Sequence, residues 1–418
     1  MLSLSRPLPE DWVIPKRELL LLWITEGFIP QQDEQRMEDT AEDYLNELIN
    51  RNLIQVVAVS INERIKKCRV HDLVRDLCIK KAKKQKLFEI QNNIVHVPSS
   101  SSSHPSTKCR RQGILSCIVL NLEGIEFRNR LSSSVGRLIH LTYLSIKLPF
   151  TFRESNSFFS KLPTSLGNLR RWQTLDIGIV ILEKPTVIQK MKNLRHLFLF
   201  YHSQDGKPLL IDSLSYLQTL SNIWVSDWRQ NDTSKLTSLG KLKIQGKFDL
   251  EMVEFSNSIA KLENLRSLYL EAYPPGVPSF VMNSWLHLSK LQIKGRIPQL
   301  PHARQFPPSL TQLTLEETEL DYDPMAILEK RQKLLTLRLR KDSYLGEEMQ
   351  VSAHGFPRLK VIQLFGLNRM RRLNIEKGGM SKLTQLQVFE SVLDINGLSE
   401  LLLLQKVDVI TTSLDHHP

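Results

Sequence analysis

The sequence predicts an α/β protein: a leucine-rich-repeat solenoid, shaped as a horseshoe with a parallel concave sheet, preceded by a small winged-helix domain. Two observations predict this class. Leucines return at one short interval from residue 138 onward, as in stacked repeats. The residues before them show helical patterns followed by two short strands. We therefore expect a winged-helix domain at 1–90, a Ser-rich linker at 91–112 and a leucine-rich-repeat domain at 113–418.

The N-terminal segment shows helix signals before strand signals. Pro15 can open a helix that KRELLLLWITE continues, and Gly27 can stop it. A second helix is expected at 40–51, with an apolar stripe on one face. LIQVVAV and KKCRV predict two strands joined across SINER, and a third helix should follow His71. Helices followed by a two-stranded wing describe a winged helix.

The repeats each end in an L-x-L pattern that alternates between inward and outward side chains, as a short strand requires. Leu268, Leu291 and Leu313 are separated by 23 and 22 residues, inside the range typical of leucine-rich repeats. An array of amphipathic helices is disfavoured, because Pro and Gly interrupt the pattern repeatedly. Strands are expected at about a dozen anchors: Leu144, Leu175, Leu197, Leu220, Leu242, Leu268, Leu291, Leu313, Leu337, Ile362, Leu386 and Val407.

Composition excludes some classes of protein. With 418 residues, 41% of them hydrophobic, the chain can bury a core, and wholesale disorder is excluded. The net charge of +12 favours acidic partners without identifying one. Four cysteines without a C-x-x-C pair fit a reducing compartment. The first residues lack a secretory pattern and no apolar run is long enough to span a bilayer, so we expect a cytoplasmic protein without a transmembrane segment.

Two stretches resemble a known family. PLPEDWVIPKRELLLLWITEGFI is similar to the winged-helix segment of plant nucleotide-binding leucine-rich-repeat disease-resistance proteins, and VHDLVRDLCIKKA is similar to their Met-His-Asp motif. The spacing of the two motifs resembles that of the coiled-coil class. The resemblance implies a protein of plant innate immunity, truncated to its winged-helix domain plus leucine-rich repeats. It would act in pathogen recognition and regulation, through protein-protein binding by the repeats.

The same resemblance implies a nucleotide contact. In that family the winged helix closes over ADP held by a separate domain; carried over, His71 would contact the phosphate end, with Asp72 beside it and Val70 in the usual place of Met. No G-x-x-x-x-G-K-S/T phosphate loop occurs in this sequence. We therefore expect no cofactor in this chain alone, and ADP or ATP only with a nucleotide-binding domain in trans. His71 as a helix-capping residue stays an open alternative.

The residues also leave two other functions open. The lysine-rich run at 80–86 beside a winged helix raises a nucleic-acid-binding scaffold as the alternative, although no helix rich in Arg, Asn and Gln is present to read bases. A non-functional remnant of a truncated receptor is a further alternative. No catalytic motif and no metal-ligand spacing occur, so we expect a protein that is not an enzyme and holds no metal.

The predicted partner is a protein: a pathogen effector, a guarded host protein or the nucleotide-binding domain of a receptor. Large outward aromatic residues are the usual anchors of such interfaces. Trp172 stands where repeats carry Leu, so we expect it to be buried. The protein-binding candidates are Phe198, Phe200, Tyr201, Trp224 and Trp228.

Overall fold

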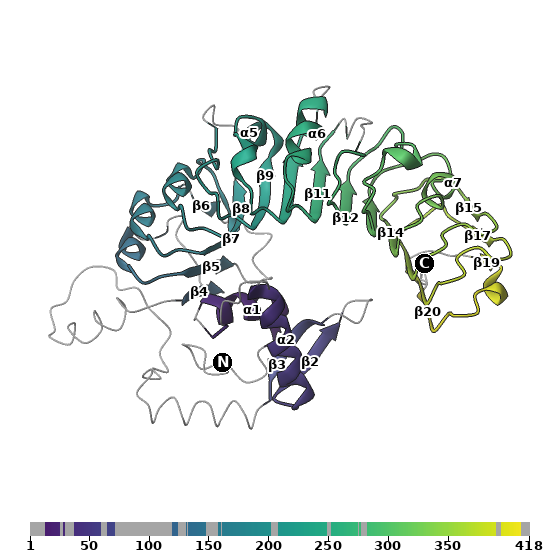
Figure 1. Cartoon of the computed structure of the whole chain (residues 1–418), viewed down its shortest axis with the longest axis horizontal. Coiled ribbons are helices and arrows are strands. Elements are labelled where there is room, and N and C mark those ends of the chain that lie inside the picture. The colour runs from purple at the N-terminus through teal and green to yellow at the C-terminus, as the bar shows by residue number, and fades with distance from the viewer. Residues whose placement is uncertain are drawn as a thin grey trace, which may run out of the picture. The chain divides into compact units, whose positions relative to one another are not determined.

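The computed structural model of the chain (Figure 1) divides into two compact units. The first comprises residues 1–157 and 163–177, and the second comprises residues 158–162 and 178–418. The structure describes residues 13–25, 28–29, 37–59, 65–71, 119–123, 131, 133–147, 158–159, 161–201, 208–248, 252–274, 276, 282–389 and 394–410.

The N-terminal part of the first unit contains the helices and strands that the sequence predicts for a winged helix. Helix α1 (Lys16–Thr25) and helix α2 (Met37–Asn50) precede strands β2 (Ile54–Val59) and β3 (Ile65–Val70). Strand β1 (Ile14–Pro15) adds an edge that was not predicted, so the antiparallel sheet has the order β1-β3-β2. The predicted helix after His71 and the Ser-rich linker lie outside the described residues.

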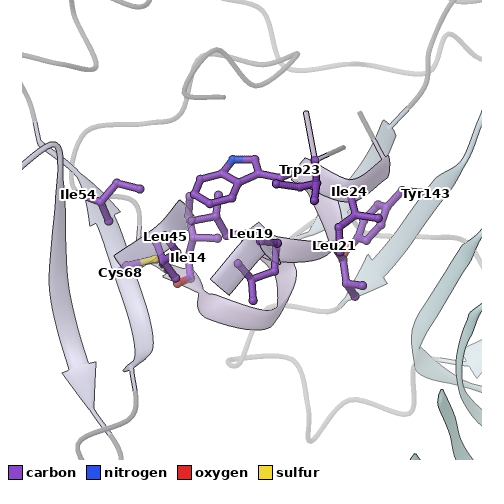
Figure 2. Close-up of a cluster of buried hydrophobic side chains, with 12 residues drawn as sticks. Ile14, Leu19, Leu21, Trp23, Ile24, Leu45, Ile54, Cys68 and Tyr143 are labelled. Atoms are coloured by element: carbon purple, nitrogen blue, oxygen red, sulfur yellow. Dashed lines mark hydrogen bonds between the residues drawn. The ribbon is translucent and has the colours of Figure 1, made fainter. Parts of the chain in front are cut away.

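A hydrophobic core packs these elements together (Figure 2). Leu19 and Trp23, one helical turn apart on α1, are buried against Leu45 of α2 and Cys68 of β3. Burial raises the pKa of the Cys68 thiol to about 11, so it remains protonated at neutral pH. The same cluster includes Tyr143, from the first strand that the sequence predicts for the repeats, so α1 packs on the start of the repeats within this unit.

Repeat strands complete the first unit. Strands β4 (Val119–Glu123), β5 (Tyr143–Lys147) and β7 (Thr174–Ile181) pair in parallel, and β7 continues into the second unit. Short 3-10 helices η1 (Ser133–Arg137) and η3 (Thr164–Asn168) precede β5 and β7. Sequence reasoning missed β4, because its L-x-L at Leu120 and Leu122 lacks the three-residue leucine spacing that precedes the other strands.

The second unit is the expected solenoid. Its strands pair in parallel in chain order, leucine beside leucine, and line the inner side of the curve (Figure 1). Strand β6 (Phe158–Phe159) pairs with the end of β7. The inner strands are β8 (His196–Tyr201), β9 (Thr219–Trp224), β10 (Lys241–Gly246), β11 (Ser267–Ala272), β12 (Lys290–Lys294), β13 (Gln312–Glu316), β14 (Thr336–Arg340), β16 (Val361–Phe365), β18 (Gln385–Phe389) and β20 (Lys406–Ile410).

The segments between the inner strands contain shorter elements that the sequence analysis did not predict. Three strands, β15 (Glu348–Val351), β17 (Arg372–Ile375) and β19 (Asp394–Asn396), form a second parallel sheet on the outer side. The helices are α5 (Val225–Arg229), α6 (Met252–Ala260), α7 (Met325–Leu328) and the 3-10 turns η4 (Thr186–Lys190), η5 (Thr233–Lys235), η6 (Ala303–Gln305) and η7 (Leu398–Glu400). The predicted fold class, a solenoid preceded by a winged helix, is confirmed.

Gly295 shows how tightly neighbouring repeats approach. It follows β12 with φ +110°, and a Cβ added there would lie 2.4 Å from the carbonyl oxygen of Ala272. Gly295→Ala should therefore destabilise the protein by about 1–3 kcal/mol, measured by thermal denaturation, because both the backbone angle and the contact become strained. Gly378→Ala is the control: its φ is +83° but the nearest atom is 3.4 Å away, so the loss should be smaller. Equal losses would contradict the contact argument.

Candidate binding surface on the inner strands

His71, the predicted nucleotide contact, lies directly after β3. Its backbone N–H donates to the carbonyl of Leu53 at 3.2 Å. Its ring Nδ1 is buried and, within the described part of the chain, has no hydrogen-bond partner. A buried polar atom without a partner is costly, so a ligand group that reached Nδ1 would be favoured there. Asp72, its predicted neighbour, lies outside the described residues.

The five aromatic candidates do not share one environment. Phe200 is 43% exposed and Trp224 is half-buried. The indole Nε1 of Trp224 donates to the carbonyl of Tyr201 at 2.8 Å, which fixes the ring. Phe198, Tyr201 and Trp228 are only 7%, 4% and 1% exposed.

Three of the five candidates, Phe198, Tyr201 and Trp228, are therefore corrected: they are buried in the core and do not form outward anchors. Tyr201 points inward on β8, as Leu197 and Leu199 do, because alternate residues of a strand share one face. Its hydroxyl donates a hydrogen bond to the carboxylate of Asp227 inside the protein. Trp228 lies on α5 and faces the core of the repeat. The prediction that Trp172 is buried is confirmed, with 0% exposed.

Outward positions of the inner strands form two parallel rows, which we call the inner surface. One row lies between the two buried residues of each L-x-L and the other directly after them, with about 4.8 Å between neighbouring strands. From β10 to β18 the first row is Lys243, Tyr269, Gln292, Thr314, Arg338, Gln363 and Gln387, and the second is Gln245, Glu271, Lys294, Glu316, Arg340, Phe365 and Phe389.

At β10–β12 the inner surface holds an ion-paired cluster. Glu271 lies 2.7 Å from Nζ of Lys243 and 3.2 Å from Nζ of Lys294. Lys243 also lies over the ring of Tyr269, 4.5 Å from its centre. Burial opposes the ionisation of Glu271, but the two ammonium groups outweigh it and lower its pKa below the usual range. Both ammonium groups are paired with the one carboxylate, and the side chains hold one another in place.

Removing this carboxylate should have a pH-dependent cost. A carboxyl whose pKa is lowered by folding adds stability above its unfolded pKa and loses that contribution as pH falls through the folded pKa. Glu271→Gln should therefore destabilise the protein by about 1 kcal/mol at neutral pH. The difference from the parent should disappear as pH falls through the lowered pKa of Glu271, measured by urea denaturation. Glu263→Gln, an exposed control, should show no such trend; a difference for Glu271→Gln that is independent of pH would contradict the ion-pair account.

At β14–β20 the inner surface is different. Nε of Arg338 and a terminal nitrogen of Arg340 both donate to Oε1 of Gln363, at 2.6 and 3.4 Å. Nε2 of Gln363 donates to Gln387, which in turn donates to Asp408 at 2.6 Å. Burial and the neighbouring Arg340 lower the pKa of Arg338 to about 10. Two guanidinium groups therefore share one neutral acceptor.

Among the described residues, no group of three metal-ligating side chains is present. None of the helices in the described ranges is long and apolar enough to cross a membrane. The two rows of the inner surface were not predicted from the sequence, although the signal was present. They are the residues inside and directly after each L-x-L, such as those of TLRLR at 336–340.

Comparison with protein families matches two segments of the chain. Residues 112–417 match the leucine-rich repeat region family, and residues 8–78 match the winged helix domain of disease resistance proteins. The first match covers most of the chain and includes every inner strand. The second includes α1, α2 and the wing strands.

Among curated proteins, the chain is similar to plant disease resistance proteins. It is 28% identical to the disease resistance protein RPP8 of Arabidopsis thaliana, over 91% of this chain and 46% of that protein. It is also 28% identical to the disease resistance RPP8-like protein 3 of the same plant, over 90% of this chain and 46% of that protein. The chain spans about half the length of the curated relatives it matches.

Solved structures with repeat folds are more distant. An internalin from Listeria monocytogenes is 18% identical, with a TM-score of 0.46 over 71% of this chain and 88% of that one. A leucine-rich-repeat protein of Leptospira interrogans is 17% identical, with a TM-score of 0.31 over 64% of this chain and 76% of that one.

Proposed function

The chain belongs to the leucine-rich-repeat proteins of plant disease resistance, and from this premise we propose that it serves in plant defence by binding another protein on its inner surface. The observation that supports the proposal most directly is the composition of this surface. It combines fixed charges with exposed or half-buried aromatic rings, which are the residue types that anchor protein interfaces.

The partner would be a pathogen effector, a guarded host protein or the nucleotide-binding domain of a receptor. The charged groups of the inner surface can orient a partner during encounter, while the aromatic groups supply contact area. Phe200 and Trp224 remain as aromatic anchors from the original candidates. The action would be recognition and regulation, without a catalytic step.

A cytoplasmic location fits the buried Cys68, which is a free thiol within the winged helix. Proteins that work in a reducing compartment keep such cysteines unpaired. Location can be tested by a fluorescent fusion in leaf cells. A signal confined to the cell wall or to a membrane compartment would contradict this part of the proposal.

The winged helix would act as part of an ADP-dependent switch. Its own residues supply one buried group, Nδ1 of His71, and Asp72 beside it in sequence; the phosphate cradle must come from a nucleotide-binding domain. When bound, ADP or ATP would supply phosphate charge for His71 to contact. The His71 contact would favour the closed arrangement over the open one.

The nucleotide proposal can be tested with a relative's nucleotide-binding domain supplied in trans and loaded with ADP. We expect the chain to slow ADP release and His71→Ala to lose this effect. Lys66→Ala, exposed on β3, the strand that precedes His71, is the control. Equal ADP retention by the parent chain and His71→Ala would remove His71 as a nucleotide contact.

The binding proposal can be tested in plants. Lines that express the chain, a double Lys243→Glu and Lys294→Glu variant, or a double Lys330→Glu and Lys333→Glu variant would be compared for pathogen growth in leaves. Lys330 and Lys333 are exposed outside the inner surface, so they match the charge change. We expect only the first pair to lose resistance. Equal resistance in all lines would contradict a role of the inner surface.

A further inference from the structure

Two arginines on the inner surface, Arg338 and Arg340, have no carboxylate partner among the residues that the structure describes. The lysines of this region pair with acids: Lys294 with Glu271, Lys341 with Glu316 and Lys406 with Asp408. Arg338 and Arg340 differ, because within the described ranges neither has an acidic oxygen within 4.0 Å. Two like charges side by side on a half-buried surface are unfavourable unless a counter-charge arrives.

The arginines are held in position by a chain of buried amides. Gln363 and Gln387 are 4% and 3% exposed, and each donates onward, to Gln387 and to Asp408 respectively. Because Gln363 donates through Nε2, its Oε1 is left as the acceptor that Arg338 and Arg340 share. Each guanidinium has five N–H donors, and the hydrogen bonds to Gln363 use one from each. The site is therefore preorganised and still has donors for an anion.

One acidic residue lies in register with this pair but is already engaged. Glu316 pairs with Arg340 along the parallel ladder, yet its carboxylate is 3.0 Å from Nζ of Lys341 and 3.4 Å from the amide of Gln292. Turning Glu316 toward Arg340 would leave Lys341 with its longer contact to Glu317 at 3.6 Å. In the described part of the chain, the charge of the two arginines is therefore not balanced by Glu316.

An apolar patch adjoins the arginines in the same register. Arg340 is the ladder neighbour of Phe365, and Phe365 is the neighbour of Phe389. The two rings are half-buried, with centres 6.3 Å apart. A ligand that reaches the arginines would therefore meet aromatic surface on the next two strands.

We propose that Arg338, Arg340, Phe365 and Phe389 bind an extended segment of a protein partner, with an acidic side chain on the two arginines and an apolar side chain two residues away on the two rings. The centre of the ring pair lies one and a half strand spacings from the arginine strand, about 7 Å. Residues i and i+2 of an extended chain are separated by about 6.6 Å and share one face. The inference deepens the proposed function and rests on it.

The test begins with a display library of short random peptides selected on the purified chain. Enriched peptides should carry Asp or Glu two positions from an apolar residue. One of them, labelled with fluorescein, would then be titrated by anisotropy. We expect binding to weaken roughly tenfold or more for R338Q/R340Q, and similarly when the acid of the probe is changed to its amide. The protein variant and the amide probe together should weaken binding little more than either change alone, because both remove the same contact.

Matched variants exclude indirect effects. R369Q/R371Q removes the same charge from exposed positions away from the inner strands and should bind like the parent. If R338Q/R340Q unfolds at a lower temperature than the parent, its weaker binding could come from lost stability. In that case the probe with its acid changed to an amide tests the inference, because it is measured on the parent protein. Enriched peptides without an acid, or equal affinity for R338Q/R340Q, would overturn the inference.

The same titrations separate this inference from the proposed function. Peptides that bind R338Q/R340Q normally but lose affinity for the K243E/K294E variant would leave the inner surface as a binding face and remove only the arginine site. Peptides unaffected by both variants, or no enrichment at all, would count against both.

Discussion

Replacing Asp227 with alanine should destabilise the protein by about 3–5 kcal/mol, because it removes one partner of a buried ion pair. Asp227 is 0% exposed. Its carboxylate accepts from Nζ of Lys184 at 2.9 Å, from the hydroxyl of Tyr201 at 2.7 Å and from the backbone N–H of Leu209 at 3.1 Å. The variant would leave the Lys184 ammonium buried without its counter-charge.

This carboxylate ties together parts of successive repeats. Burial and the nearby Asp227 charge raise the pKa of Tyr201, so the hydroxyl stays protonated and donates at any pH at which the protein is folded. The Tyr201 oxygen in turn accepts from the backbone N–H of Trp224 at 3.3 Å. The loss of Asp227 therefore leaves both a cation and a hydroxyl unsatisfied.

The measurement is urea denaturation of the parent, Asp227→Ala and Asp227→Asn. We expect the amide variant to fall between the other two, because it keeps one acceptor oxygen but loses the charge. Asp212→Ala is the control: Asp212 pairs with Lys235 at the surface, 3.4 Å apart, and its loss should cost about 0–1 kcal/mol. A loss for Asp227→Ala as small as the control would contradict the account.

Trp228→Ala is the second large effect, with an expected loss of about 3–5 kcal/mol from the cavity that it leaves. Trp228 is 1% exposed, and its indole Nε1 donates to the hydroxyl of Ser258 at 2.9 Å. Ser258 donates to the carbonyl of Phe255, whose ring meets Trp285 edge-on with centres 6.5 Å apart. The indole therefore links α5 to α6 in the next repeat.

Thermal denaturation, together with binding of a partner or probe, shows whether an aromatic residue packs in the core or anchors a partner. Phe200→Ala, at a 43% exposed position, should leave the free energy of unfolding within about 1 kcal/mol of the parent while reducing any binding on the inner surface. Unchanged stability with lost binding for Trp228→Ala would show that Trp228 is an anchor after all.

The main repeat strands could be predicted because the same pair of apolar positions returns at one interval, and these positions are buried in the strands from β5 to β18. Every L-x-L anchor from Leu144 to Val407 lies in a strand of the inner sheet, and neighbouring anchors pair, as Leu291 does with Leu268 and Leu313. The outer sheet could not be predicted in the same way. Strands β15 and β17 are four residues long and bury two side chains each, and β19 has only three residues, none of them buried. Such patterns are too short to stand out in a sequence.

The candidate site could be predicted only in kind. The sequence indicated a protein-binding solenoid and proposed aromatic anchors, but parity within a strand and packing from other repeats decide which rings are exposed. Phe200 and Tyr201 are adjacent in sequence, yet one is 43% exposed and the other 4%. His71 was identified by resemblance, and its buried Nδ1 became visible only in the folded winged helix.

The domain order, the strand interval and the strand register follow from the amino-acid sequence, because they depend on apolar side chains that recur locally. Which charged side chains meet depends on the folded structure. Partners such as Lys243 with Glu271, or Arg338 with Gln363, lie about one repeat apart in sequence and become neighbours only when strands stack. Charge pairing is a property of residues brought together by folding, so the unneutralised Arg338 and Arg340 could not be recognised from TLRLR alone.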